Sequence, residues 1–327
     1  MLKYVIRRML TMIPTLIVIS VLVFVLIQLP PGDILTSRLR ELQQQGEEIS
    51  EEQIAALRAR YHLDDPLYVQ YVKWVTGFLR GDLGYSIVYE QPVNELIWER
   101  LGYTLLIALS CMLFTWAVAL PLGIFSAVRK YTLPDYGLTV VAFLGLSTPG
   151  FMLALVLMYV GHEVFGVSVG GLFSPRYAGQ PWGCGKLLDL LKHLWIPMVV
   201  VGATGTAGLM RVMRANLLDE LQKPYVITAR AKGVGAVRLI LKYPVRIAIN
   251  PFISTVGWML PALFSGSTIV AVVLSLPTTG PLLLESLMNQ DMYLAGSFIL
   301  ILSTLTVIGT LISDILLAAT DPRIRFE

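Results

Sequence analysis

The chain contains a series of long apolar runs, and these runs constrain its fold more strongly than any other feature. A helix needs roughly 20 residues to cross the hydrocarbon core of a bilayer, and six runs provide that length. They lie between Arg8 and Asp33, Arg100 and Arg129, Asp135 and His162, His193 and Arg211, Arg246 and Glu285, and Asp291 and Asp314. Alternating hydrophobic periodicity is absent, which disfavours a transmembrane barrel. The sequence therefore predicts an all-α polytopic membrane protein with six transmembrane helices.

The composition agrees with this prediction. Hydrophobic residues make up 55% of the chain and charged residues only 14%, whereas soluble domains carry about 25% charged residues. The net charge of +3 is too small to indicate a nucleic-acid partner, and the topology described next accounts for most of the excess.

Basic residues set the expected topology. Lys3, Arg7 and Arg8 precede the apolar run from Met9 to Leu29. This run is too long for a cleaved signal peptide and no cleavage site follows it, so we expect a retained helix. Positive residues favour the cytosolic side of a membrane, and the amino terminus is therefore expected inside. The same rule places further basic groups inside: Arg129 and Lys130, the loop 211–246, and Arg323 and Arg325. Both termini are then cytosolic.

Residues 31–99 form the one sizeable polar segment, and this topology places them outside. Ser50 to Gln53 precede apolar residues in the pattern of a capped amphipathic helix. An apolar stripe then continues at helical spacing: Tyr68, Tyr71, Val72, Trp74 and Phe78. Because such stripes are usually packing surfaces, we expect a helical external insertion after the first span rather than a ligand site. A second external segment, Gly166–Lys192, is rich in glycine and is expected to be irregular.

The basic loop from Arg211 to Arg246 carries the signals of a short helix. Pro224 suits a first helical position and Gly233 suits a left-handed helix end, which predicts a helix from Tyr225 to Lys232. Two turns of helix hardly persist alone in water, so other groups must hold it. A docking partner is the economical explanation. The alternative is a solvated loop whose basic residues only set the topology.

Catalytic and nucleotide-binding motifs are absent from the sequence. Gly185-Lys186 is similar to part of a phosphate-binding loop, but Gln180 and Leu187 stand where that loop requires glycine and serine or threonine. Neither a G-x-S-x-G elbow nor an H-E-x-x-H motif occurs. We therefore expect no enzyme activity in this chain, with a membrane enzyme or assembly factor as an alternative.

The histidines and cysteines do not indicate a metal site. None of the three histidines is spaced with cysteine or carboxylate residues as zinc ligands would be, and solvated or interfacial positions are expected for them: His62, His162 and His193. Cys111 lies in the second apolar run and Cys184 in an external segment. Bilayer depth separates the two cysteines, so we expect two free thiols.

The apolar runs carry almost no ionisable residues at mid-depth. The acidic residues lie near the predicted ends: Glu163, Glu285, Asp291 and Asp314. Carriers driven by an ion gradient usually display charged groups inside the membrane. We therefore expect an energy source outside this chain, and an ion-coupled carrier that acts alone is the competing class.

Helix breakers interrupt several runs. Pro121, Pro149 and Pro197 predict helices that bend around a path. Glycines such as Gly202, Gly205 and Gly208 permit close helix approach, or reflect ordinary tight packing. The fifth run is longer than one span requires and contains Pro277, Gly280 and Pro281. We expect a helix from about Pro251 to Ser275 followed by an irregular turn.

Several motifs together resemble one family across essentially the whole chain. They are YVIRRMLTMIPTLIVISVLVFVLIQLPPGD, LDDPLYVQYVKWVTGFLRGDLGYSI, TLLIALSCMLFTWAVALPLGIFSAV, STPGF at Ser147 to Phe151, PYVITARAKG and DPRIR. The chain is similar to the inner-membrane permeases of dipeptide, oligopeptide and nickel ABC importers, and looks like the first of the two permeases. TARAKG, Thr228 to Gly233, is the most specific match.

The resemblance implies a role for the basic loop. In the family this loop is the coupling element that docks into a groove on the ATPase subunit. The matching residues are Tyr225, Thr228, Ala229, Arg230, Ala231, Lys232 and Gly233. Residues 1–327 would form a single transmembrane domain of the type I ABC importer permease fold, with an external segment 31–99 and a cytosolic coupling loop 211–246.

The resemblance also implies partners and a location. The permease would form half of a translocation path in a bacterial or archaeal cytoplasmic (inner) membrane. A second homologous permease would supply the other half, two ATP-binding subunits would bind ATP and Mg, and an external substrate-binding protein would deliver the cargo. No cofactor is expected in this chain. The cargo class would be peptides or a similar small solute such as oligosaccharides.

Several positions depart from the common family pattern. Tyr243 and Arg246-Ile247 stand where many members have histidine and an Arg-Asn pair, so the arginine is kept and the asparagine is not. Ala271 replaces an acidic residue, and Thr278-Thr279 interrupt a P-G-L-G sequence. The last two lie near the expected outer mouth, and they suggest a branch with a different cargo, oligosaccharides as well as peptides.

Overall fold

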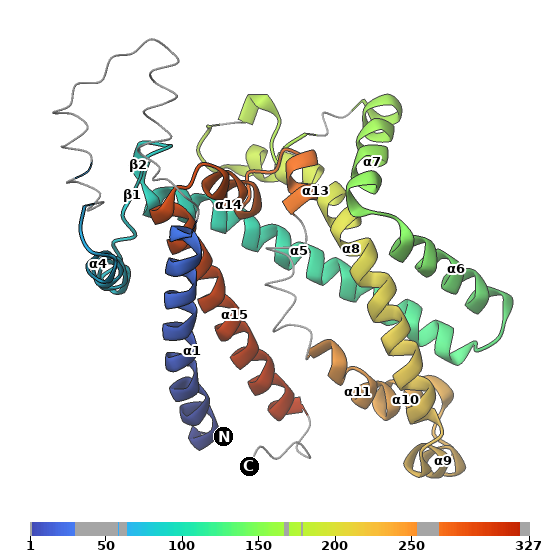
Figure 1. Cartoon of the computed structure of the whole chain (residues 1–327). Helices are drawn as coiled ribbons and strands as arrows, with labels where there is room; N and C mark the ends of the chain where they lie inside the picture. The colour runs from blue at the N-terminus through green and yellow to red at the C-terminus, as the bar shows by residue number, and fades with distance from the viewer. Residues whose placement is uncertain are drawn as a thin grey trace. The chain divides into compact units, whose positions relative to one another are not determined.

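The computed structural model describes residues 2–29, 58, 64–166, 170–177, 179–253 and 268–320, which are mostly helical (Figure 1). The longer helices are α1 (Leu2–Gln28), α4 (Leu67–Leu79), α5 (Val93–Val128), α6 (Leu133–Ser147), α7 (Gly150–Phe165), α8 (Cys184–Leu221), α14 (Thr279–Met288) and α15 (Met292–Thr320). The shorter ones are α9 (Pro224–Ala231), α10 (Ala236–Lys242), α11 (Pro244–Ala248), α13 (Thr268–Val273) and the 3-10 turn η1 (Pro175–Tyr177). Strands β1 (Tyr85–Ser86) and β2 (Gln91–Pro92) pair antiparallel, with Tyr85 opposite Pro92.

The chain divides into two compact units. The first comprises residues 1–103 and 278–307, and the second comprises residues 104–277 and 308–327. Two long helices, α5 and α15, contribute residues to both units.

Four helices of the described part are long and apolar enough to cross a membrane: Leu10–Gln28, Val93–Val128, Cys184–Leu221 and Met292–Ile315. A fifth candidate is the pair α6 and α7, which are bent by 103° relative to each other. The polytopic helical class is therefore confirmed. The predicted fifth span, Pro251–Ser275, falls largely on residues 254–267, outside the described residues.

The predicted third span is not one straight helix. The run between Asp135 and His162 forms two helices, because α6 ends at Ser147 and α7 begins at Gly150. Pro149 disfavours helical geometry in the residue before it, and Thr148 is extended, with φ −83° and ψ 121°. The expectation that Pro149 bends the chain is confirmed.

The predicted irregular segment Gly166–Lys192 is wrong in its second half. Helix α8 begins at Cys184 and runs for 38 residues. Charged residues within its first turns are buried and paired: Ser174 donates from N and Oγ to Asp189 at 2.7 and 2.6 Å, and Lys186 donates to the Gln180 carbonyl at 2.5 Å. Because Asp189 and Lys186 have these partners, α8 can begin before the apolar run that starts at His193 and can include charged residues.

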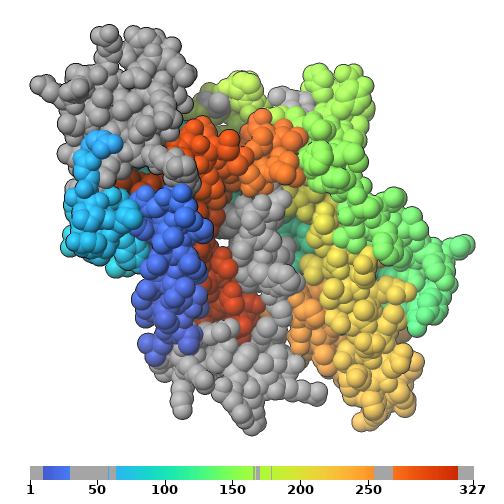
Figure 2. Space-filling model, viewed as in Figure 1, coloured from blue at the N-terminus to red at the C-terminus, as the bar shows by residue number. Residues whose placement is uncertain are grey.

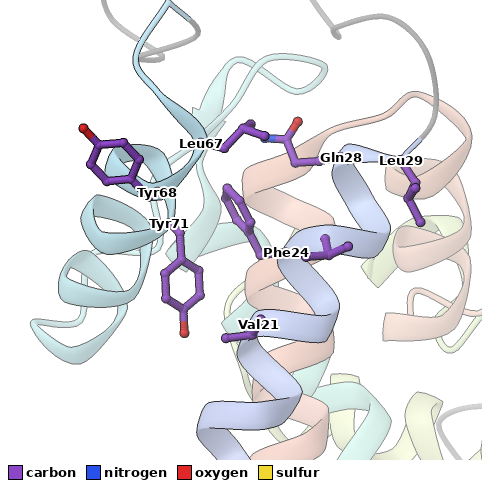
Figure 3. Close-up of a pocket in the computed structure, with 8 residues that line it drawn as sticks. Val21, Phe24, Gln28, Leu29, Leu67, Tyr68 and Tyr71 are labelled. Carbon is purple, nitrogen blue, oxygen red and sulfur yellow. The ribbon is translucent and has the colours of Figure 1, made fainter.

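The stripe of the first unit is a packing surface in part: Tyr71, Trp74 and Phe78 pack as predicted, whereas Tyr68 and Val72 are exposed. Helix α4 places Trp74 (5% exposed) and Tyr71 against Phe24 of α1, with ring centroids 5.4 Å apart for Phe24 and Tyr71 (Figure 3). Trp74 Nε1 donates to Ser297 Oγ at 3.2 Å. Tyr68 remains 72% exposed and lines a groove of about 380 Å³ between α1 and α4. The predicted cap at Ser50 lies outside the described residues.

A buried carboxylate organises the hairpin of the first unit. Asp291 is 1% exposed, and it accepts a hydrogen bond from Ser86 Oγ at 2.5 Å and one from Leu294 N at 3.2 Å. Burial raises the pKa of Asp291 above its ordinary value. This carboxylate therefore fixes the β1–β2 turn against the start of α15.

The second unit is built around α8. A core cluster joins Met213 and Leu217 of α8, both 0% exposed, to Ala119 of α5 and to Phe252. Helices α5 and α8 approach closely at Gly123 of α5, where an added Cβ would lie 2.7 Å from Met213 Cβ of α8. Such small-residue contacts are typical of membrane helix pairs.

Candidate functional site

The predicted helix of the basic loop is present as α9. It runs from Pro224 to Ala231, with Pro224 in the first turn and Lys232 as the residue that ends it. The prediction of Tyr225–Lys232 is thus confirmed to within one residue. Gly233 is left-handed, with φ +77°, as its position after the helix predicted.

The end of α9 is a complete Schellman motif. Val234 N donates to Ala229 O at 3.3 Å and Gly233 N donates to Arg230 O at 3.0 Å. Val234 and Ala229 also belong to one apolar cluster, which is the hydrophobic contact that accompanies this motif. The left-handed Gly233 is what allows both hydrogen bonds to form.

The helix is held by its own chain. Val226 (0% exposed) and Ala229 (6%) pack against Leu239 of α10 (2%), with Tyr243 at the edge of the cluster. The argument that so short a helix needs a docking partner for support is therefore wrong. Intramolecular packing stabilises α9 and leaves its opposite face open.

Most of the predicted site residues are exposed, on α9 or directly after it. Thr228, Arg230, Ala231, Lys232 and Gly233 are exposed. Tyr225 is half-buried and its hydroxyl donates to Glu220, and Ala229 is on the buried face, so a docking role by direct contact for Ala229 does not fit its position.

Motif comparison missed Ile227, which is 57% exposed on the open face of α9. A large aliphatic side chain that is open to water on a capped helix is a candidate anchor for a partner protein. The sequence does carry a signal, because Ile227 is the one large aliphatic side chain among the exposed residues of α9.

The open face is positively charged and lies at the end of a long helix. Residues 221–246 contain no aspartate or glutamate. Helix α9 follows α8 after the two residues Gln222 and Lys223; α10 packs against α9, and α11 packs against α8 and α10 (Figure 1). In Figure 2 the atoms of this segment, yellow to orange, are open to the viewer at the lower right. A partner that binds α9 would therefore act directly on the end of α8.

The histidines and cysteines do not form a second site. Within the described residues, no group of three His, Cys, Asp or Glu side chains is placed to hold a metal ion. His162 is exposed, whereas His193 is 6% exposed with its Nδ1 2.8 Å from Asp189 O, so His193 is not solvated; His62 lies outside the described residues. Cys111 is buried and Cys184 is exposed, and both are free thiols, as predicted.

Three of the residues that depart from the family pattern are buried, each within its own unit. Ala271 is 3% exposed in the second unit. Thr278 (7%) and Thr279 (1%) lie at the start of α14 in the first unit. Tyr243 belongs to the cluster that supports α9, and Arg246 is exposed.

Comparison with known families defines the class of the protein. Residues 119–326 match the binding-protein-dependent transport system inner membrane component, and residues 1–108 match the N-terminal membrane component of such transport systems. The chain belongs to this family: it is a non-catalytic, multi-pass inner-membrane permease subunit of an ABC importer, which works with ATP-binding and substrate-binding partners and holds no cofactor itself.

Individual relatives share its whole length. The oligopeptide transport system permease protein AppB of Bacillus subtilis is 36% identical over 328 residues, covering 100% of both chains. The glutathione transport system permease protein GsiC of Salmonella paratyphi A is 34% identical over 328 residues, also with 100% coverage of both. A putative peptide permease protein of Brucella ovis is 32% identical and covers 99% of each chain.

Proposed function

We propose that this permease carries short peptides and forms half of the translocation path, with a second homologous permease as the other half. Full-length relatives at 34% and 36% identity are named for glutathione, a tripeptide, and for oligopeptides. Two ATP-binding subunits hydrolyse ATP, and an external binding protein delivers the peptide. The chain forms one transmembrane domain of the type I fold, with six spans and an external helical insertion at 31–99.

The coupling function rests on one observation, the open face of α9. This face presents Ile227, and Arg230 and Lys232 are exposed nearby. The Schellman motif and the contact with Leu239 hold the helix in place. A groove on the ATPase with an apolar floor and acidic rims would complement it. Closure of the ATPase dimer then displaces α9 as a rigid body, and α8 carries the displacement into the membrane.

Reconstitution tests the proposed function. The permease, its second permease and the two ATP-binding subunits are placed in proteoliposomes with the binding protein outside. We expect uptake of a labelled tripeptide only with ATP on the cytosolic side, and no uptake by this chain alone under a proton or sodium gradient. Concentrative uptake by the chain alone would establish the ion-coupled carrier instead.

The same system tests the cargo. We expect an unlabelled peptide to reduce uptake of the labelled tripeptide. An unlabelled oligosaccharide of similar size should leave that uptake unchanged. Exchange of the binding protein for a relative with another ligand should shift the transported solute, because the apolar stretches of the described membrane helices carry at most two charged residues each. Uptake of a labelled oligosaccharide, with no uptake of the tripeptide, would assign the cargo to oligosaccharides and contradict the peptide proposal.

Cysteine labelling tests the topology. The exposed native Cys184 should react with a membrane-impermeant maleimide from outside intact cells. In a Cys184→Ser background, Lys223→Cys, at an exposed position before α9, should react only after the membrane is permeabilised. The positive-inside rule gives this expectation, since basic residues concentrate around Lys223. Labelling of Lys223→Cys in intact cells would overturn the cytosolic placement of the loop.

A further inference from the structure

One buried carboxylate in the second unit links three helices. Asp135, in the first turn of α6, is 1% exposed. Arg214 of α8 grips it with two hydrogen bonds, from Nε to Oδ1 at 3.0 Å and from Nη2 to Oδ2 at 2.8 Å. Ser126 of α5 donates to Oδ1, and the backbone N of Tyr131 donates to Oδ2 at 2.9 Å. The α5–α6 turn, the start of α6 and α8 therefore meet at a single group.

The geometry of this pair suits the transmission of displacement. Two parallel hydrogen bonds between a guanidinium and a carboxylate fix orientation as well as distance. Arg211, one turn earlier on α8, stacks over the Phe143 ring of α6 at 4.5 Å, so α6 and α8 are joined at two points. Neighbouring Met213 packs into the core cluster with α5.

The position of the pair relates it to α9. Arg214 precedes the end of α8 at Leu221 by seven residues, roughly 10 Å of helix at 1.5 Å per residue, and α9 begins three residues later at Pro224. Helix α8 is continuous from Cys184 to Leu221, so a displacement at its end reaches Arg214 without a break. On the far side of the pair, α6 leads to the bend of 103° at Pro149.

We propose that the Asp135–Arg214 pair is a positioning clamp that transmits displacement of α9 and α8 to the α5–α6 turn and the bent α6–α7 pair. This inference rests on the proposed coupling function of α9. A clamp must keep the two helices in register while both move, and a bidentate buried pair does so better than apolar contacts, which allow sliding. Loss of the clamp leaves α9 docked but lets α8 move without α6.

The test uses the complete transporter in proteoliposomes and measures the number of ATP molecules hydrolysed per solute taken up. Asp135→Asn keeps the shape of the side chain and removes its charge. Arg214→Lys keeps the positive charge and removes the guanidinium group that donates two parallel hydrogen bonds. We expect both to retain the ATP-binding subunits and to raise the ratio roughly tenfold, a size typical of coupling changes. The exchange Asp135→Arg with Arg214→Asp should recover part of the coupling.

A matched control separates positioning from stability. Ser126→Ala removes a donor to the same carboxylate but leaves the link between α6 and α8 intact, so it should lower thermal stability and leave the ratio unchanged. An unchanged ratio in Arg214→Lys and Asp135→Asn, or an equal rise in Ser126→Ala, would overturn the clamp. If Asp135→Asn does not reach the membrane, Arg214→Lys and the exchange variant decide.

The outcomes also separate this inference from the proposed function. If Ile227→Asp leaves uptake normal, α9 does not couple and the proposed function fails. If Ile227→Asp blocks uptake while Asp135→Asn and Arg214→Lys hydrolyse as many ATP molecules per solute as the unaltered protein, only the clamp proposal fails.

Discussion

Gly233→Val will uncouple ATP hydrolysis from uptake while the protein still reaches the membrane. Gly233 has φ +77°, where a β-branched side chain is strained by about 1–2 kcal/mol or more. The Schellman hydrogen bonds of Val234 and Gly233 require this conformation. Strain of that size shifts the loop away from its native conformation by roughly 5- to 30-fold, and we expect uptake to fall by at least about fivefold.

Backbone geometry, rather than bulk, is the expected cause. A Cβ at Gly233 would meet nothing within 4 Å, so the substitution creates no collision. Gly235 is the matched control: its Cβ would also meet nothing within 4 Å, but its φ is −57°, which any residue adopts. We expect Gly235→Val to transport normally and Gly233→Asn to be mild, because asparagine tolerates the left-handed region.

The measurements are ATP-driven uptake in proteoliposomes and co-purification of the ATP-binding subunits. Equal uptake by Gly233→Val and Gly235→Val would show that the left-handed end of α9 has no part in coupling. Loss of membrane insertion in Gly233→Val alone would assign the glycine to folding rather than to coupling.

Local signals in the sequence were sufficient to place α9. Proline in the first turn and glycine after the last turn act on their own backbone, so Pro224 and Gly233 bound the helix without reference to the rest of the fold. Pro149 also acts on its own backbone, which is why the sequence predicts a bend there. The angle of the bend depends on neighbouring helices. The sequence therefore does not predict that α6 and α7 diverge by 103°.

The orientation of α9 was beyond local signals. Which face is buried depends on Leu239, Tyr243 and Leu221, which fold back onto Val226 and Ala229 from outside the helix. Family motifs mark residues that matter without separating those that touch a partner from those that support the helix. Ala229 was therefore assigned to the docking contact and Ile227 was overlooked. The sequence likewise marks Asp135 only as the end of an apolar run and does not single out Arg214, because their pairing joins residues 79 apart in sequence.

Ile227→Asp and Ala229→Asp should both impair coupling, the first by weakening the docking contact and the second by destabilising the loop of the permease. This difference locates the docking face. Ile227 is 57% exposed, so a carboxylate there is hydrated in the free permease and costs the fold little. On docking it would remove an apolar anchor and place a charge in the contact, a loss of about 2 kcal/mol or more for a hot-spot residue. We expect roughly 30-fold weaker binding of the ATP-binding subunits, with an unchanged melting temperature of the permease.

Ala229→Asp acts on the permease itself. Ala229 is 6% exposed beside Val226 and Leu239, and an unpaired carboxylate there costs several kcal/mol, about 3 or more, unless α9 detaches from α10. We expect increased proteolysis of the 211–246 loop in Ala229→Asp before any partner is added, and no such increase in Ile227→Asp. Ile227→Leu, which keeps an apolar anchor, and Val237→Asp, which adds a carboxylate at a 72% exposed position on α10, should both bind normally. If Ile227→Asp and Val237→Asp weaken binding equally, net charge of the loop governs docking and the open face of α9 is not its specific site.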